Sequence, residues 1–158
     1  MRVAVLNGPH DLVVEHRPAP RAGPGQLLVR VHSVGVCGSD THYYDHGRIG
    51  RFVVESPLVL GHEASGEVVD IGPGVTTRHP GQRVSIEPGV PDLTCEQCLA
   101  GRDNLCPAMR FFATPPIDGA LAEFVVVHPA FAHPVPDTMD DDAAALLEPL
   151  SVGIWACR

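Results

Sequence analysis

The stretch Leu58–Gly72, LVLGHEASGEVVDIG, carries the strongest structural signal in the chain. An apolar run stops at Gly61, His62 and Glu63 follow side by side, and a strand of small and β-branched residues continues after them. Burying a histidine beside a glutamate is costly unless a partner neutralises and orients both side chains. We therefore expect that the two neutralise each other, or that a catalytic partner or a metal ion does so.

Cys37, in the segment VGVCGSDTHYY, is a candidate third member of this group. Gly35 and Gly38 flank it, and we expect them to let the backbone turn closely around the thiol. Catalytic zinc sites commonly combine three protein ligands drawn from thiolate, imidazole and carboxylate, and they keep a fourth position open. The types of these side chains therefore match a zinc site.

The spacing of His62 and Glu63 needs a local explanation, because consecutive residues of a regular strand face opposite sides. A bend at Gly61 could aim both side chains at one point. The residues alone leave two interpretations open. One is a catalytic zinc site of Cys37, His62 and Glu63, and the other is a buried structural cysteine near an unrelated His–Glu turn.

A second cluster lies in VPDLTCEQCLAGRDNLC, residues 90–106. Cys95 and Cys98 form a C-x2-C pair that can hold one tetrahedral ion, and Cys106 can close the loop around it. Asp92 lies three residues before Cys95, the same spacing that separates Cys95 from Cys98, and it offers a carboxylate oxygen as fourth ligand. The alternatives are a structural zinc bound by all four side chains and an empty, degenerate site in which Asp92 is a solvated turn residue.

Composition restricts the possible functions. The 158 residues suffice for one domain with its own core, and 16 glycines and 16 prolines favour many short strands joined by tight turns. A net charge of −8 argues against a nucleic-acid partner. All eleven basic residues are arginines, which excludes Schiff-base chemistry on a lysine.

The sequence has no signal-peptide pattern and no apolar run long enough to cross a membrane, so we expect a cytoplasmic protein without a membrane partner. In that compartment, five cysteines indicate metal ligands or nucleophiles rather than disulfides. This agrees with the two clusters above.

Local patterns predict a mainly β fold with a C-terminal helix. A hairpin is expected around residues 7–10, one or two helical turns over 38–44, and a helix over 137–158 in which Pro149 starts a new helix or kinks this one. Within that helix, local sequence favours Glu148 as a surface residue. The expected strands are Val3–Leu6, Leu12–Glu15, Gln26–Val36, Ser65–Ile71, Arg83–Ile86 and Leu121–Val127.

Longer motifs resemble a known family. GHEASGEVVDIGPGV resembles the zinc signature of the medium-chain dehydrogenase/reductase superfamily, in its N-terminal GroES-like domain. VCGSDTHYYDHGRIG, IEPGVP, FFATPPIDGALAEF and ALLEPLSVGIWACR resemble the sorbitol (L-iditol) and xylitol dehydrogenase branch. The likeness runs from about residue 3 to residue 158 and implies a partly open GroES-like β-barrel with a few short helices.

The resemblance implies a role for each matching residue. Cys37, His62 and Glu63 fall on the catalytic zinc ligands, and Glu148 falls on an acid that approaches this zinc directly or through its water. Asp40 matches an acid that would orient the zinc-bound histidine. The remaining matches are a proton relay of Ser39 and His42, a substrate pocket containing Tyr43, Phe111 and Thr114, and a structural zinc lobe of Asp92, Cys95, Cys98 and Cys106. Relatives usually have cysteine where this chain has Asp92, and some have lost that metal.

The implied reaction oxidises a secondary alcohol of a small polyol to a ketose, with zinc as Lewis acid and hydride transfer to NAD(P). A dinucleotide site needs a Gly-rich turn within a βαβ unit, and the sequence shows none. We therefore expect residues 1–158 to be the GroES-like catalytic domain of a longer enzyme whose coenzyme domain is missing here. We expect this portion to be inactive alone and the full-length enzyme to be a homo-oligomer.

Two alternatives remain at this stage. The chain could come from a zinc alcohol or threonine dehydrogenase, since pocket residues separate these enzymes poorly. It could also be a stand-alone GroES-like zinc-binding module without catalysis. The presence of both a relay pair and a mixed ligand set argues against a purely structural module.

Overall fold

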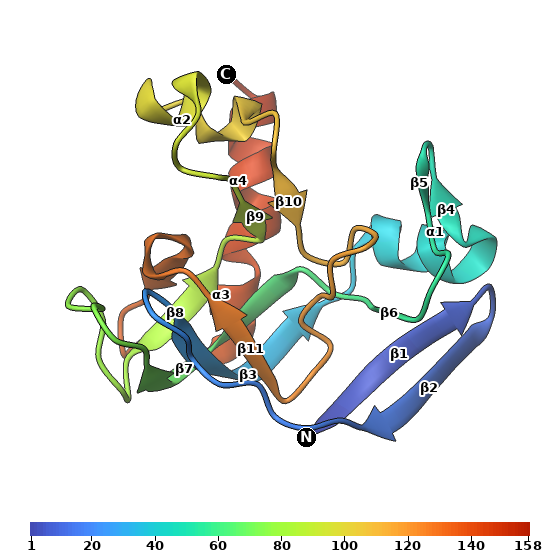
Figure 1. Ribbon diagram of the computed structural model, residues 1–158, viewed down its shortest axis with the longest axis horizontal. Coiled ribbons are helices and arrows are strands. Elements are labelled where there is room, and N and C mark those ends of the chain that lie inside the picture. Colours follow the sequence, from blue (N-terminus) through green and yellow to red (C-terminus); the bar gives the residue numbers. More distant parts are fainter.

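The computed structural model describes residues 1–158, and its centre is a five-stranded antiparallel sheet (Figure 1). The strand order is β11-β3-β7-β8-β12. Apolar side chains of these strands pack with Phe112 and Ala120 into the largest buried cluster. The strands are β3 (Leu27–Gly35), β7 (Glu63–Ile71), β8 (Arg83–Ile86), β11 (Phe124–Val127) and β12 (Ala132–Pro134).

A smaller sheet of order β2-β1-β6 lies beside the first one. β1 (Arg2–Gly8) and β2 (Asp11–His16) form the hairpin expected around residues 7–10, and β6 (Leu58–Val59) pairs with the other side of β1. Two short hairpins complete the β structure. They consist of β4 (Arg48–Ile49) with β5 (Phe52–Val53), and β9 (Gly89–Val90) with β10 (Arg110–Phe111).

The helices are short and lie outside the sheets (Figure 1). None of them combines the length and the apolar character that a membrane crossing needs. They are α1 (Gly38–His46), α2 (Glu96–Leu99), α3 (Asp141–Ala145) and α4 (Leu147–Ala156), with 3-10 turns η1 (Asp103–Leu105) and η2 (Pro129–Phe131).

The predicted mainly β architecture is confirmed, and its sheets stay open without closing into a barrel. The last predicted strand begins at Phe124 instead of Leu121. The backbone of the preceding segment bonds elsewhere: the N–H of Leu121 donates to the carbonyl of Leu60 at 2.9 Å, and that of Ala120 to Gly61 at 2.7 Å. These bonds fix the segment that leads into β7.

The predicted C-terminal helix is divided in two. Asp140 caps α3, where its Oδ1 accepts from the N–H of Ala143 at 2.7 Å, so the helix begins later than residue 137. The chain bends at Leu146, and Pro149 lies in the first turn of α4, where its missing N–H costs no helical hydrogen bond. Of the two alternatives that the sequence left open for Pro149, a new helix or a kink, the structure shows the new helix.

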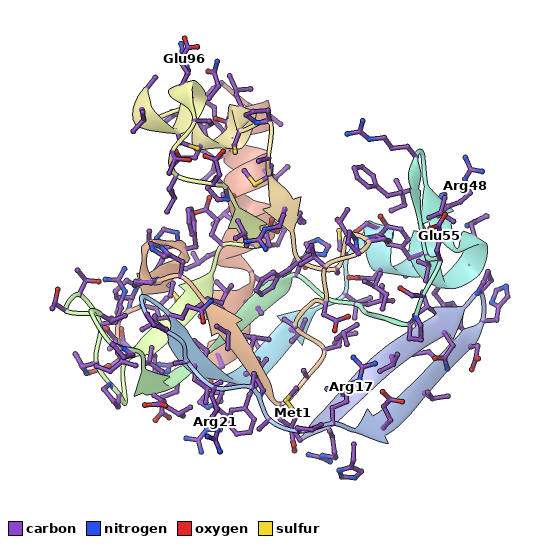
Figure 2. All side chains as sticks on the ribbon, viewed as in Figure 1. Met1, Arg17, Arg21, Arg48, Glu55 and Glu96 are labelled. Carbon is purple, nitrogen blue, oxygen red and sulfur yellow. The ribbon has the colours of Figure 1, made fainter.

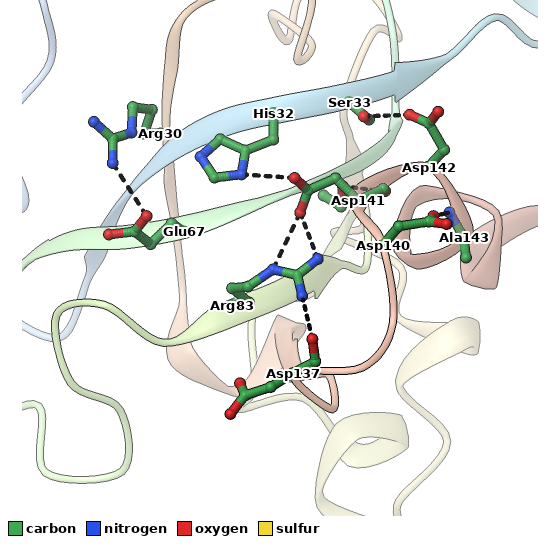
Figure 3. Close-up of polar contacts among 11 residues, drawn as sticks. Arg30, His32, Ser33, Glu67, Arg83, Asp137, Asp140, Asp141, Asp142 and Ala143 are labelled. Carbon is green, nitrogen blue, oxygen red and sulfur yellow. Dashed lines mark hydrogen bonds and ion pairs between the residues drawn. The ribbon is translucent and has the colours of Figure 1, made fainter.

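Polar contacts fasten α3 to the central sheet (Figure 3). Nε and Nη2 of Arg83 donate to Oδ1 of Asp141 at 3.2 and 2.7 Å, and His32 Nδ1 lies 3.1 Å from Oδ2 of the same carboxylate. The hydrogen bonds from Arg83 are the main cause that lowers the pKa of Asp141. The hydroxyl of Ser65 also donates to the Asp141 carbonyl at 2.6 Å. Together these bonds hold the first residue of α3 against the central sheet.

Candidate metal centres

Cys37, His62 and Glu63 converge on one point between the two sheets. Cys37 lies between β3 and α1, Glu63 is the first residue of β7, and His62 immediately precedes that strand. One ligand atom from each of the three side chains lies within 4.8 Å of the others, so a single ion can contact all three. His62 and Glu63 are buried and Cys37 is half-buried.

Gly61 allows two consecutive side chains to share this point. Its φ is 84°, in the left-handed region that favours glycine. A Cβ built at Gly61 would lie 2.8 Å from the side chains of Leu121 and Val34, so the space around it is also closed. The bend expected from the sequence is therefore present and is specific to glycine.

Gly35 contributes differently from our expectation. It continues β3 in register with Glu63 instead of turning the chain around the thiol, and Gly38 simply starts α1. A Cβ at Gly35 would lie 2.3 Å from Oε2 of Glu63, whereas one at Gly38 would meet nothing within 4 Å. Gly35 thus provides the space that the Glu63 carboxylate occupies.

Asp40 connects the two segments that carry the candidate ligands. Its Oδ2 accepts from the backbone N–H of Cys37 at 3.0 Å, and its Oδ1 accepts from the N–H of Gly61 at 2.9 Å. Oδ1 also lies 3.9 Å from Nδ1 of His62. The residue is 4% exposed. The buried carboxylate of Asp40 thus lies on the Nδ1 side of the His62 ring.

Glu148 faces the same region from the first turn of α4. Burial raises the pKa of its carboxyl, the nearby His62 opposes this, and Glu63 and Glu87 add to it. Local sequence favoured a surface residue, but the side chain is half-buried and electrostatically coupled to the cluster. It lines a cavity of about 490 Å³ together with Phe111, Met109 and Glu87.

The remaining residues predicted around this centre divide into two groups. Ser39 and His42 are three positions apart on α1, half-buried and exposed respectively, and the ring of His42 stacks on His46 with centroids 4.4 Å apart. Phe111 places its ring 5.6 Å from that of His62. Of these three side chains, Phe111 is the one for which the structure shows a contact with the cluster, and the relay role of Ser39 and His42 stays a prediction.

Tyr43 and Thr114 are further inside the protein. Tyr43 is 3% exposed and packs with Leu6, Leu58 and Leu60. Burial raises the pKa of its phenol, and a hydrogen bond with the Thr114 side chain partly opposes that shift. Tyr43 is thus a core residue whose hydroxyl faces Thr114, and its role in a substrate pocket stays a prediction.

The second cluster forms a separate lobe around α2. One ligand atom from each of Asp92, Cys95, Cys98 and Cys106 lies within 4.8 Å of the others. Figure 2 shows sulfur atoms gathered in this lobe. The Sγ atoms of Cys95 and Cys98 are 3.4 Å apart. Three thiolates and a carboxylate form a donor set that closes a tetrahedral zinc site.

Asp92 also organises the loop. Its Oδ1 accepts from the N–H groups of Thr94 and Cys95, both at 2.8 Å, and these bonds lower the pKa of its carboxyl. The Asp92 N–H donates to the Cys106 sulfur at 3.4 Å and is the main cause of the lowered pKa of that thiol. Burial raises the pKa of Cys98 to about 12. Metal binding must therefore displace a proton from Cys98.

Sequence reasoning missed two side chains that border the cavity beside Glu148. His133 Nε2 lies 2.8 Å from Oε2 of Glu87, and both residues line the cavity. His133 belongs to β12 and Glu87 follows β8, so the pairing of these strands brings the two residues together. No local motif indicated this contact.

Comparisons with known proteins agree with this geometry. The family model "Alcohol dehydrogenase GroES-like domain" matches residues 23–137. Chicken (Gallus gallus) sorbitol dehydrogenase is 53% identical over 154 residues, covering 98% of this chain but only 43% of the relative's own length. The chain thus spans less than half of the curated relatives it matches.

Two solved structures have nearly the same fold. L-idonate 5-dehydrogenase from Escherichia coli superposes with a TM-score of 0.88 at 34% identity, covering 97% of this chain and 44% of the other. A provisionally assigned zinc-binding dehydrogenase from Sinorhizobium meliloti 1021, bound to NADP, gives a TM-score of 0.85 at 35% identity, covering 97% and 43%. The family match extends over most of the central sheet and both metal-ligand clusters, and the chain therefore belongs to the alcohol dehydrogenase GroES-like domain family.

Proposed function

We propose that this chain is the metal-binding catalytic portion of a zinc- and NAD(P)-dependent polyol dehydrogenase, and that residues 1–158 form one domain of that enzyme. The observation that carries the proposal is the convergence of Cys37, His62 and Glu63 within 4.8 Å. One thiol, one imidazole and one carboxylate leave a fourth position free, as catalytic zinc requires. Sorbitol and L-idonate dehydrogenases among the relatives favour a polyol-type substrate.

Bound zinc would lower the pKa of a substrate hydroxyl, and a bound nicotinamide would accept hydride from the same carbon. The protein supplies the remaining parts. Asp40 holds the thiol and imidazole segments in place through backbone hydrogen bonds. Ser39 and His42 carry the released proton along α1 to solvent. Glu148 adjusts the charge next to the reacting hydroxyl, and Phe111 packs against His62 and limits how the substrate can approach.

The second cluster has a structural role in this proposal. Asp92, Cys95, Cys98 and Cys106 would hold a zinc ion without an open position. Asp92 supports its own loop through two N–H groups, so the carboxylate has to serve the loop and the ion at once. The cytoplasmic location and the homo-oligomeric full-length enzyme expected from the sequence belong to the same proposal.

Metal analysis of the purified chain tests this function. We expect two zinc ions per chain, and one after the substitution Cys37→Ser. Cobalt substitution distinguishes the two sites, because the lobe with three thiolates gives stronger thiolate-to-metal absorption than the site with one. Cys157→Ser removes an exposed cysteine outside both clusters and is the matched control, which must keep both ions.

The same samples distinguish the alternatives. A polyol that binds at the open position changes the visible spectrum of cobalt at the Cys37 site, and Cys37→Ser abolishes this change. Spectral changes with simple alcohols or threonine, but not with sorbitol or xylitol, would favour the alcohol or threonine dehydrogenase alternative. Zinc in the lobe alone would favour a non-catalytic module.

A further inference from the structure

The outer edge of β2 is apolar and unpaired, and no part of the proposed function uses it. β2 is the edge strand of its sheet, with β1 as its one neighbour, and Figure 1 shows it along the outer side of the hairpin. Leu12, Val13 and Val14 are 43%, 40% and 71% exposed. Edge strands usually block association with proline, a bulge or a charge. The middle of β2 has none of these, and the irregularity of the hairpin lies on β1 between Leu6 and Gly8.

Hydrogen bonds of β1 show which backbone groups of β2 are free. The N–H of Ala4 and the carbonyl of Arg2 bond away from β2, to Leu121 and Glu123. The backbone N–H and C=O groups of the odd-numbered residues of β1 therefore point toward β2. There, Val3 is paired with Glu15 and Val5 with Val13. Backbone groups of successive strand residues alternate in direction. The N–H and C=O groups of Leu12, Val14 and His16 thus point to the open edge.

We propose that β2 pairs antiparallel with β2 of a second copy of this chain, about a two-fold axis at Val14. In a symmetric pairing through these free backbone groups, an even-numbered residue of one copy can lie opposite only an even-numbered residue of the other copy. The register that uses all three places Val14 opposite Val14 and Leu12 opposite His16. This pairing joins the three-stranded sheets of the two copies into one continuous sheet of six strands. The contact is isologous, because both copies use the same strand, and it closes as a dimer.

Charges select this register over its neighbours. With Val14 on the axis, the non-hydrogen-bonded pairs between the two strands are Asp11 with Arg17 and Val13 with Glu15. A shift that centres the axis on Val13 would place Asp11 opposite Glu15, and a shift to Glu15 would place two copies of that carboxylate opposite each other. Like charges directly opposite across strands are destabilising. Only the Val14 register brings opposite charges together at both ends.

The same charge pattern argues for a second copy as the occupant. Arg17, labelled in Figure 2 near Met1, has its Nε 2.6 Å from Oε1 of Glu15 and its Nη1 3.3 Å from Oδ2 of Asp118. In the dimer, Asp11 of the other copy joins this half-buried guanidinium from the opposite strand. The contact consists of one strand from each copy and falls at the small end of specific interfaces, so the association depends on concentration.

Cysteine cross-linking tests the register directly, in the zinc-loaded chain carrying Cys157→Ser. Opposed residues of a hydrogen-bonded antiparallel pair have Cα atoms about 5.5 Å apart, within the range that a disulfide spans. Val14→Cys is therefore expected to give a disulfide-linked dimer in a glutathione redox buffer. Leu12→Cys is the matched control on the same strand face. Its two copies would be offset by about 14 Å along the strands, so it should give no dimer above the Cys157→Ser parent.

Sedimentation equilibrium provides the test without a cross-link. Val14→Lys places two like charges at the axis and should weaken dimerisation at least tenfold, whereas Val152→Lys on the exposed face of α4 should leave it unchanged. Equal cross-linking at positions 12 and 14 would overturn the register. Dissociation by Val152→Lys but not by Val14→Lys would place the contact on α4. A monomeric parent at millimolar concentration, with no cross-link at Val14, would also overturn the proposal.

Discussion

The substitution Gly35→Ala tests how the fold positions a candidate metal ligand. The new Cβ would lie 2.3 Å from Oε2 of Glu63, 3.1 Å from its Cβ and 3.3 Å from its Cδ. Real Cβ atoms essentially never approach another heavy atom to 2.3 Å, so the carboxylate has to move. Gly35 and Glu63 are paired across β3 and β7, so the backbone cannot easily separate them. The substitution therefore displaces a ligand without removing any functional group.

The cost follows from two general magnitudes. Inserting a methyl group into a packed site costs about 1–3 kcal/mol, and tenfold in an equilibrium constant corresponds to about 1.4 kcal/mol. Loss of an interaction that orients a metal ligand typically costs about 10–100-fold in affinity. We therefore expect Gly35→Ala to weaken zinc at the Cys37 site by about 10–100-fold and to leave the three-cysteine lobe unchanged.

Competition against a chromophoric chelator measures zinc affinity, and a variant lacking a lobe ligand, Cys95→Ser, assigns the release from the Cys37 site. Gly38→Ala is the matched control, since its Cβ would meet nothing within 4 Å. If Gly35→Ala retained zinc at the Cys37 site as tightly as Gly38→Ala did, the carboxylate would not be held where we place it. The explanation given for Gly35 would then fail.

Three further predictions follow from the carboxylates. Asp40→Asn leaves one acceptor oxygen for two buried N–H groups, and we expect the free energy of unfolding in urea to fall by about 1–3 kcal/mol; an unchanged midpoint would contradict the bridging role. Asp141→Asn weakens the contact with Arg83 and should cost about 1–2 kcal/mol at pH 7 after allowance for partial exposure. Because the folded pKa of Asp141 is lowered, its contribution is complete above the unfolded pKa near 4 and disappears as pH falls through the folded value. The stabilities of protein and variant should therefore converge in acid, and a constant difference down to pH 3 would refute this origin. Asp92→Cys supplies a fourth thiolate and should slow zinc loss from the lobe to a chelator; faster loss would show that the two N–H bonds of the aspartate matter more than the donor atom.

The meeting of His62 and Glu63 was predictable because its signal is local, whereas the residues alone left open whether the distant Cys37 joins them. Ordinary strand alternation cannot place His62 and Glu63 together, and Gly61 was the residue able to break that alternation. The positive φ at Gly61 shows that it does so. The function of Gly35 was not predictable, because it depends on the register of β3 against β7, which brings a residue from a distant segment against it.

The C-terminal helix illustrates the same limit. Pro149 predicted either a new helix or a kink, and the structure shows a new helix, α4, with that proline in its first turn. The predicted helix begins at residue 137 and α3 begins at Asp141, because the sequence contains four aspartates between positions 137 and 142, any of which can cap a helix. Asp140 is selected by tertiary structure, since the next residue is held by Arg83 from β8. Local propensity offered several candidates, and one contact distant in sequence decided among them.

The two clusters obtain their geometry in different ways. Cys37 and His62 lie on segments that Asp40 ties together across 21 positions, between packed sheets, so the protein core orders these ligands before any ion arrives. The ligands of the lobe all lie within residues 92–106, where α2 and η1 contain no buried residue. Metal binding to such a segment also provides folding free energy. We therefore expect the ligands of the first cluster to keep their positions without a metal ion, and the ligands of the lobe to be ordered mainly by the ion they bind. Replacing Gly35, Asp40 or Gly61 should therefore disturb the first cluster even without metal, whereas a change at Asp92 should show mainly in how tightly the lobe holds an ion.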